Sequence, residues 1–289
     1  MRWHVAILYF LLRLTGRLPL RVLHGAGATL GWLLWRLPNP LRRKAVQTLS
    51  HVRTQFGTKS SHEILKPALI ETGKGALELC KIWSGDPQAA LGLVREVQGG
   101  EIFDAAAASG RGLIIAAPHL GCWELLNFWL CSRTSIAIAY RPPRRPEIEP
   151  LLIRARGALA AEQVRADGAA GVRALYKRLL AGGVVGILPD QQPKAGEGEF
   201  APFFSTPALT MVLLSRLAQR TGATVLFAFA ERLPRGAGFR IHIRTAPEGI
   251  ADSDLPTAVA ALNRGVEECV RIAPAQYQWA YKRYSIRPQ

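Results

Sequence analysis

An apolar run that leads into a polar turn organises this chain: Gly112-Leu113-Ile114-Ile115-Ala116-Ala117-Pro118-His119-Leu120-Gly121-Cys122-Trp123-Glu124. The aliphatic residues of this run predict a short strand that is buried on both faces and ends at Pro118. In open α/β sheets ligands bind beyond the carboxyl ends of the strands, which is where His119 and Glu124 would lie. An imidazole and a carboxylate delivered together at such an edge are typical of a general-base pair, in which the carboxylate orients the imidazole.

Apolar strands and amphipathic helices alternate along much of the remaining chain. Further strands are expected at residues 135–140, 184–188, 224–230 and 239–244. Helices are expected at 61–83, 101–108, 123–132, 149–161, 171–180, 206–220 and 255–272. Helices between apolar strands favour a mostly parallel central sheet that is covered by helices on both faces. The sequence therefore predicts an α/β fold, with a single α/β domain over residues 39–289.

The first 38 residues differ from this pattern and are expected to form a separate helical segment. Their apolar stretches, 5–12 and 22–35, are shorter than the ~20 residues that a bilayer-spanning helix needs. Amphipathic aromatic residues and arginines of this kind lie at the headgroup level of membranes; here they are Trp3, Tyr9, Trp32 and Trp35 with Arg2, Arg13, Arg17, Arg21 and Arg36. We expect residues 1–38 to form a hydrophobic helical membrane anchor, lying on the bilayer or inserted as a tilted hairpin. An ordinary helix packed on the domain is the alternative.

The composition indicates a basic globular protein in a reducing compartment. Lysine and arginine number 37 against 21 aspartates and glutamates, so the formal net charge is +16. Such a surface attracts an anionic partner, which could be nucleic acid, an anionic membrane, or an acidic carrier or substrate. The four cysteines show no metal-ligand spacing and have apolar neighbours, so buried free thiols are expected. The aromatic residues are not interleaved with basic ones as in a base-stacking surface, which makes a nucleic-acid-binding protein a remote alternative.

Several familiar catalytic motifs are absent from the sequence. It contains no GxSxG elbow, no GxxxxGK[ST] loop and no GxGxxG fingerprint, so serine hydrolases, P-loop proteins and dinucleotide-binding proteins are disfavoured. Of the six histidines, none forms a metal-ligand pattern with neighbouring carboxylates.

Polar residues follow three of the predicted strands and could converge on one site. Besides His119 and Glu124 they are Tyr140-Arg141 and Asp190-Gln191-Gln192. Convergence of such groups at one sheet edge is how α/β enzymes assemble an active site. Arg154 and Arg156 lie on the predicted helix at 149–161, where a solvated surface charge is the alternative for each. Residues 189–207 are rich in glycine and proline and are expected to form a loop. Loops of this length in a compact domain are usually functional or disordered.

Together these residues resemble the late acyltransferases of bacterial lipid A biosynthesis, within the wider lysophospholipid acyltransferase class. That class carries a histidine followed, after four residues, by an acid. The lipid A branch commonly has glutamate there, an HX4E motif, as His119 and Glu124 do. The segments Leu188–Gln192 and Pro202–Thr210 are similar to two further family segments, and Arg156 resembles a family arginine. The resemblance covers essentially the whole chain.

The resemblance implies transfer of a fatty acyl group from acyl carrier protein to a hydroxyl of a lipid A precursor. His119 would be the general base and Glu124 would orient it, while Arg156, Asp190 and Gln191 would bind substrate. Asp190 would do so by shaping the pocket or by holding Arg156. A thioester is already activated, so no metal or organic cofactor is implied.

The implied partners are acyl carrier protein, a membrane-lipid acceptor and an anionic membrane, at the cytoplasmic face of the bacterial inner membrane. No nucleic acid is implied. A glycerolipid or lysophospholipid acyltransferase that uses the same pair is the alternative. For either enzyme, Phe200, Phe203 and Phe204 would form a wall for the acyl chain or would fill the core.

Overall fold

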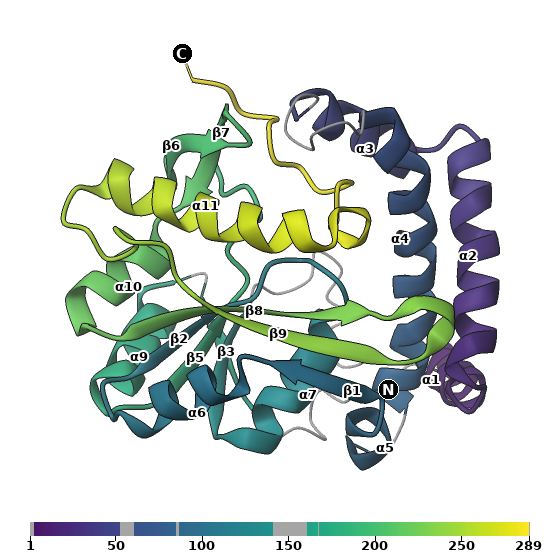
Figure 1. The fold of residues 1–289 in the computed structure, drawn as a ribbon, viewed down its shortest axis with the longest axis horizontal. Helices are drawn as coiled ribbons and strands as arrows, with labels where there is room; N and C mark the ends of the chain where they lie inside the picture. Colours follow the sequence, from purple (N-terminus) through teal and green to yellow (C-terminus); the bar gives the residue numbers. More distant parts are fainter. Residues whose placement is uncertain (1–2, 53–60, 85–86, 141–160, 167, 289) are drawn as a thin grey trace.

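The computed structural model describes residues 3–52, 61–84, 87–140, 161–166 and 168–288 (Figure 1). In these parts of the chain the central sheet has seven strands in the order β1-β9-β8-β2-β5-β3-β4. Their bounds are β1 Val94–Gln98, β2 Leu113–Ala116, β3 Ile136–Tyr140, β4 Glu162–Arg165, β5 Val184–Ile187, β8 Thr224–Arg232 and β9 Phe239–Thr245. Strands β8, β2, β5, β3 and β4 are parallel, whereas β9 is antiparallel to β8 and parallel to β1. The predicted α/β fold with a mostly parallel sheet is confirmed.

Helices cover both faces of this sheet (Figure 1). The helices of the described parts of the chain are α1 Trp3–Gly16, α2 Leu20–Arg36, α3 Pro40–Ser50, α4 Ser61–Ser84, α5 Pro87–Leu91, α6 Gly100–Ala108, α7 Trp123–Arg133, α9 Ala169–Leu180, α10 Leu213–Thr221 and α11 Leu255–Ile272. Successive side chains of a strand point to opposite faces. Leu113 and Ile115 of β2 accordingly pack with α6 and α7, while Ile114 and Ala116 pack with α9, α10 and α11. This two-sided burial explains why β2 is apolar at every position.

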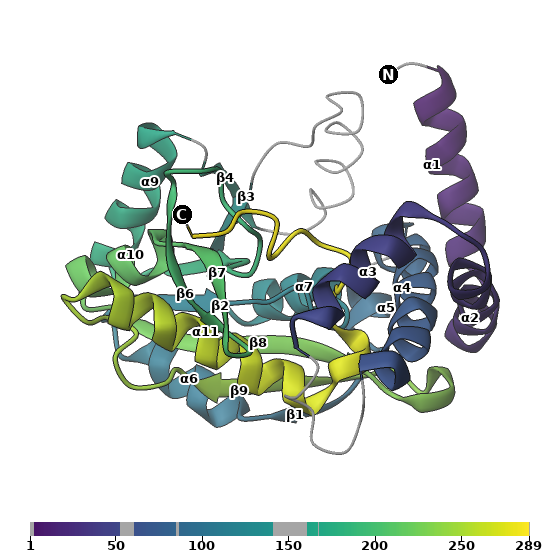
Figure 2. The ribbon, with the colours of Figure 1, turned by 90° about the horizontal axis from the view of Figure 1, so that it is seen from above.

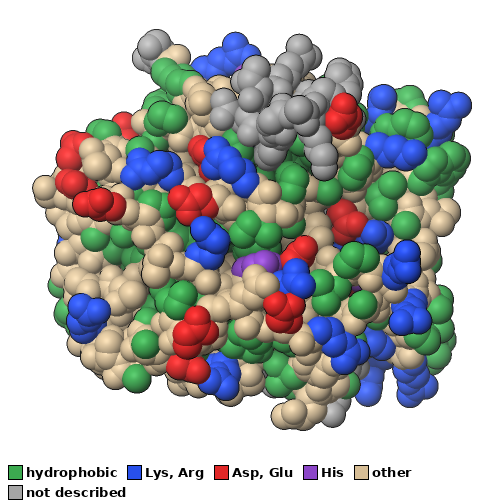
Figure 3. Space-filling model, in the orientation of Figure 1, with side chains coloured by type: hydrophobic (Ala, Val, Ile, Leu, Met, Phe, Trp, Pro, Cys, Tyr) green, Lys and Arg blue, Asp and Glu red, His purple; other side chains and the backbone are tan. Residues whose placement is uncertain are grey.

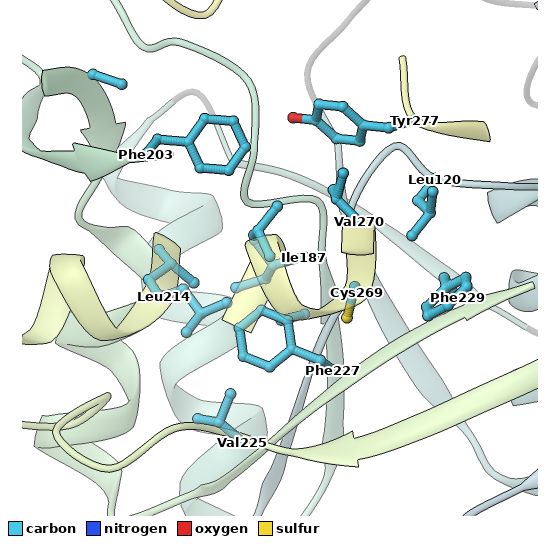
Figure 4. Packing of buried hydrophobic residues seen from close by; sticks show 14 of the residues in the cluster. Leu120, Ile187, Phe203, Leu214, Val225, Phe227, Phe229, Cys269, Val270 and Tyr277 are labelled. Carbon is cyan, nitrogen blue, oxygen red and sulfur yellow. The ribbon is translucent and has the colours of Figure 1, made fainter. Parts of the chain in front are cut away.

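Figure 4 shows part of the core on the α11 face of the sheet. Phe227 and Phe229 of β8 and Ile187 at the end of β5 belong to one buried cluster with Cys269 and Val270 of α11. The four cysteines are free, as expected, and Cys122 and Cys269 are buried. Cys80 and Cys131 are only half-buried, so the expected burial is wrong for these two. This cluster extends to the end of β5, where the candidate site begins.

Two predicted elements differ from the structure. Residues 206–211, predicted as the beginning of a helix, form β7 (Thr206–Met211), which pairs with β6 (Gly198–Phe203) in an antiparallel hairpin. Phe204 and Ser205 form the turn with φ values of 48° and 63°, so the chain reverses there and the helix α10 begins at Leu213. The predicted loop at 189–207 therefore contains a strand. Phe203 and Phe204 lie in the core, which supports the core-filling interpretation for these two residues.

The helix predicted at 149–161 lies, apart from residue 161, outside the described residues. The short strands β1 and β4 were not predicted from the sequence, because their burial patterns include few fully buried positions. A strand with little apolar surface carries only a weak sequence signal.

The N-terminal helices stand beside one end of the sheet, and Figure 2 shows α1 projecting from the rest of the molecule. Helices α2 and α4 pack backbone to backbone through glycines. A Cβ atom on Gly31 would lie 2.4 Å from the Cα of Ile70, and one on Gly73 would lie 2.2 Å from the carbonyl oxygen of Gly27. None of the helices in the described parts of the chain is both long enough and apolar enough to cross a bilayer.

Candidate functional site

The candidate site forms where β2 and β5 end side by side. These strands are parallel, and their register pairs Ala116 with Ile187. His119 and Asp190 each follow the paired position by three residues, so the sheet delivers both to the same edge. The predicted convergence of polar residues from these two strand ends is therefore confirmed.

His119 and Asp190 form a buried hydrogen-bonded pair. Nδ1 of His119 lies 2.7 Å from Oδ1 of Asp190, and the backbone N–H of His119 donates to Oδ2 at 2.9 Å. The two residues are 5% and 3% exposed. Burial alone would raise the pKa of Asp190, but His119 lowers it below its ordinary value, through the charge of the ring when it is protonated and through its hydrogen bonds. Asp190 is thus a carboxylate at neutral pH, and Nδ1 of His119 carries the proton that it accepts.

The second ring nitrogen of His119 faces Gln191. The amide Nε2 of Gln191 lies 3.1 Å from Nε2 of His119, and an amide N–H can donate only to an unprotonated ring nitrogen. Both contacts therefore select the same tautomer, with the proton on Nδ1 and the lone pair on Nε2. That tautomer is the one in which an imidazole accepts a proton from a substrate through Nε2.

Aromatic side chains surround the imidazole. The ring of Tyr281 stands edge-on to His119 with centroids 4.7 Å apart, and that of Trp123 does so at 5.3 Å. Burial and, after it, the charge of Asp190 raise the pKa of Tyr277 and of Tyr281, so each remains a neutral phenol. Neither tyrosine was predicted as a site residue from the sequence, although the aromatic residues of Tyr277–Tyr281 indicate that this segment packs against the rest of the fold.

Glu124 lies in the first turn of α7 and is 2% exposed. Its charge contributes to the raised pKa of Tyr281, after burial and the charge of Asp190. The carboxylate that the structure places on Nδ1 of His119 is that of Asp190. Asp190 thus contacts His119, while its predicted role of shaping the pocket or holding Arg156 stays a prediction, because Arg156 lies outside the described residues. The catalytic role of Glu124 stays a prediction.

Some of the other predicted residues are described by the structure, and some lie outside the described residues. Tyr140 is half-buried at the end of β3. Arg141, Arg154 and Arg156 lie outside the described residues. Gln192 accepts hydrogen bonds from the backbone N–H groups of Ser285 and Ile286, so it ties the C-terminal segment to the end of β5. Phe200 is half-buried on β6.

The turn that carries His119 is held by backbone hydrogen bonds on both sides. The carbonyl of His119 accepts from the N–H of Gln278 at 3.0 Å, and the N–H of Cys122 donates to the carbonyl of Ala230 at 2.8 Å. The N–H of Gly121 donates to the carbonyl of Gln276 at 3.2 Å. The turn therefore lies between the end of β8 and the segment that follows α11. Within the described residues, no group of three histidine, cysteine, aspartate or glutamate side chains is placed to hold a metal ion.

Comparison with known proteins gives a family match and several relatives. The model of the family described as "Bacterial lipid A biosynthesis acyltransferase" matches residues 1–285. The chain is 28% identical over 278 residues to a lipid A biosynthesis lauroyltransferase of Escherichia coli, covering 94% of this chain and 88% of that protein. It is 27% identical over 225 residues to a lipid A biosynthesis palmitoleoyltransferase of the same organism, covering 76% and 69%. It is also 30% identical over 155 residues to a phosphatidylinositol mannoside acyltransferase of Mycobacterium tuberculosis, covering 52% and 48%.

Proposed function

Because the chain belongs to the bacterial lipid A biosynthesis acyltransferase family and is an acyltransferase, we propose that it acylates a hydroxyl of a lipid A precursor. The acyl donor is acyl carrier protein, and the reaction takes place at the cytoplasmic face of the inner membrane. The observation that carries this proposal is the His119 imidazole, with Nδ1 bonded to buried Asp190 and Nε2 holding a lone pair.

In the proposed reaction Nε2 of His119 takes the proton of the acceptor hydroxyl. The hydroxyl oxygen then attacks the thioester carbonyl, the carbon–sulfur bond breaks, and the imidazolium returns the proton to the departing thiolate. The carboxylate of Asp190 stabilises the imidazolium while it carries the extra proton. An acceptor that reaches Nε2 takes the place of the Gln191 amide. General-base assistance of this kind contributes a factor of about 10²–10⁴ to the rate.

The remaining roles are proposed from the family resemblance together with position. Glu124 is the second carboxylate of the site and adds negative charge beside the imidazolium. Arg156 holds an anionic group of the donor or acceptor, or meets the charge on the thioester oxygen during attack. Residues 39–289 form the acyltransferase domain, and residues 1–38 form the segment that contacts the membrane.

Exposed apolar side chains on the N-terminal helices support this membrane contact. Phe10 and Leu14 of α1 are 64% and 51% exposed, and Val22 and Trp32 of α2 are 51% and 44% exposed. Figure 3 shows lysine and arginine side chains next to hydrophobic ones along the edge where Figure 1 places these helices. An apolar surface with basic neighbours suits the interface of an anionic bilayer. The net charge of +16 also suits an acidic carrier protein and a phosphorylated lipid.

The test is an acyl-transfer assay with acyl carrier protein thioester and a hydroxyl-bearing lipid A precursor, comparing the wild-type chain with three variants. His119→Ala should lower turnover by about 10²–10⁴ because the base is removed. Asp190→Asn should also lower it strongly, because an amide can stabilise the wrong tautomer. Glu124→Gln should lower it too, because the negative charge beside the imidazolium is removed. His242→Ala is the matched control, since His242 is a buried histidine paired with a different carboxylate, Glu231.

Three results would contradict parts of the proposal. Near-normal turnover by His119→Ala would exclude the proposed base. Acylation of lysophosphatidate without acylation of hydroxyacyl sugar lipids would favour a glycerolipid acyltransferase. Activity with other thioesters but none with the acyl carrier protein thioester would reject the proposed donor.

A further inference from the structure

A buried ion pair lies next to the candidate site and takes no part in the mechanism above. Arg232, the last residue of β8, is 6% exposed, and Glu78 of α4 is 1% exposed. Nε and Nη2 of Arg232 each donate to one carboxylate oxygen of Glu78 at 2.6 Å. Removing two charges from water is costly, and a buried pair of this kind is weak evidence for stability by itself. A geometric role is the better explanation for its presence.

The third strong contact of Arg232 reaches the catalytic turn. Its Nη2 also donates to the carbonyl oxygen of Gly121 at 2.8 Å, two residues after His119. The side chain of Gln276 bonds both the backbone N–H and the carbonyl of Arg232, at 2.8 and 2.9 Å. The carbonyl of Gln276 in turn accepts from the N–H of Gly121. Arg232, Gln276 and Gly121 thus form a closed ring of hydrogen bonds that fixes both backbone groups of Gly121.

Glu78 connects this ring to the helices beside the sheet. Its Oε2 lies 3.1 Å from Nε2 of His24 on α2. Burial and, after it, the charge of Glu78 raise the pKa of the Cys122 thiol at the end of the same turn. Burial would raise the pKa of Glu78, but Arg232 and His24 lower it to about 2. The carboxylate is therefore charged throughout the physiological range, and it is hydrogen-bonded to residues of β8 and α2.

We propose that Arg232 and Glu78 are positioning residues that hold His119 in its catalytic position through the Gly121 carbonyl. The proposal rests on the proposed role of His119 as the general base. Neither residue touches the reacting atoms. Their effect is to keep the turn from shifting, so that Nδ1 stays on Asp190 and Nε2 stays where the acceptor replaces the Gln191 amide. His24 extends the pair onto α2, and the placement of the base thereby depends on an N-terminal helix.

The experiment compares Arg232→Met, Arg232→Lys and Arg178→Met in the full chain, with kcat, KM for the acyl donor and melting temperature measured for each. Arg232→Met should lower kcat by about 10²-fold at unchanged KM, since a displacement of about 1 Å at a reacting group has an effect of this size. Its pH profile of kcat should also shift, because the pairing of His119 with Asp190 is disturbed. Arg178 is the matched control, because it too donates to a carboxylate and to a backbone carbonyl, those of Glu162 and Val184.

Arg232→Lys separates positioning from folding. The lysine keeps a positive charge opposite Glu78, but it lacks the planar fork that bonds two carboxylate oxygens and the Gly121 carbonyl together. We expect its melting temperature to return toward the wild-type value while its kcat stays low. Arg178→Met should keep wild-type kcat and the wild-type pH profile.

The outcomes distinguish this inference from the proposed function. If the wild-type chain transfers no acyl group, or if His119→Ala is active, the proposed function fails first. If His119→Ala is inactive but Arg232→Lys has wild-type kcat and pH profile, the positioning role is overturned. The same conclusion follows if Arg232→Met loses activity only in proportion to its unfolded fraction. Should Arg232→Met fail to fold, Arg232→Lys decides the question.

Discussion

Gly121 occupies a position in the His119 turn where a Cβ atom would clash unless the backbone moved. Its φ is 62°, and a Cβ atom there would lie 1.9 Å from the carbonyl oxygen of Ala230. That carbonyl is also the acceptor for the N–H of Cys122. Close approach of two backbone segments is a typical reason for glycine in such a turn. The distance between the turn and β8 is therefore set by the absence of one methyl group.

We predict that Gly121→Ala loses most acyl transfer and that its destabilisation exceeds the ~1–3 kcal/mol expected for a left-handed non-glycine residue. The additional loss comes from the clash with Ala230. Gly110→Ala is the matched control, because Gly110 has a φ of 68° and a Cβ atom there would meet no other atom within 4 Å. Turnover and urea unfolding of both variants check the prediction; equal behaviour of the two would contradict it.

Glu78 makes the stability of the protein sensitive to acid. Its pKa is lowered from 4.5 to about 2 because the attraction of Arg232 and His24 outweighs the effect of burial. A depressed pKa in the folded state stabilises the protein above pH 4.5, and this contribution is lost as the pH falls toward 2. The shift corresponds to roughly 3 kcal/mol. The lowered pKa of Asp190 also makes the folded protein less stable as the pH falls.

We therefore predict that the free energy of unfolding falls by roughly 3 kcal/mol between pH 4.5 and pH 2 on account of Glu78. Glu78→Gln should be less stable at pH 7, by about 3–5 kcal/mol, because Arg232 loses its closest charged partner and keeps only Glu71, at 3.5 Å. Its acid dependence should be correspondingly shallower. Glu162→Gln, which alters an exposed partner of Arg178, should keep the wild-type dependence. Urea unfolding across this pH range measures all three, and an unchanged slope in Glu78→Gln would rule the explanation out.

At the scale of elements, the contact between α2 and α4 decides where the N-terminal helices stand. Gly27 and Gly31 on α2 and Gly73 on α4 let the two backbones touch, and His24 and Glu78 join the same helices by a buried hydrogen bond. Small residues permit close approach, and the buried polar contact selects the register. The geometry of α2 relative to the site is thus defined by two different kinds of contact.

We predict that Gly31→Ala destabilises the protein by about 1–3 kcal/mol, because the added methyl group overpacks the interface. Its Cβ would meet the backbone of Leu69 and Ile70 at 2.4 Å. Gly25→Ala, on an open part of the same helix with no atom within 4 Å, should be neutral or stabilising, since alanine favours helix. Thermal unfolding of the two variants is the measurement. A Gly31→Ala protein as stable as wild type would show that the helices can separate freely.

At the scale of the whole molecule, the N-terminal helices stand at the sheet edge where His119 lies. Arg232 at the end of β8 contacts both Glu78 of α4 and the His119 turn, and Glu78 in turn contacts α2. A lipid surface that contacts these helices would therefore lie near the base. This arrangement suits an acceptor that stays in the bilayer while its hydroxyl reaches Nε2.

We predict that replacing Phe10, Leu11 and Leu14 of α1 with glutamine weakens binding to vesicles that contain anionic phospholipid. These side chains are 51–64% exposed, so their loss should leave folding intact while removing apolar area from the interface. Leu180→Gln is the control, since Leu180 is 57% exposed on α9. Vesicle flotation checks the result. Undiminished flotation of the triple variant would reject α1 as a membrane-contacting helix.

The sequence by itself determined the strands β2 and β5, the mostly parallel sheet and the sheet edge that carries the site. These features depend on local patterns, because a run of apolar residues signals burial on both faces wherever it occurs. The same patterns failed at residues 206–211, where pairing with β6 outweighed the helical periodicity of the segment. Strand pairing depends on a partner strand elsewhere in the chain, and the local sequence of one segment does not show which strand that partner is.

Only the tertiary structure decided which groups touch His119. Glu124 is near in sequence, yet the register of β2 against β5 brings Asp190 to Nδ1. Tyr277, Tyr281 and Arg232 reach the same turn from segments more than a hundred residues away. Local patterns determine what a segment becomes, whereas contacts between remote side chains depend on how the segments pack in space.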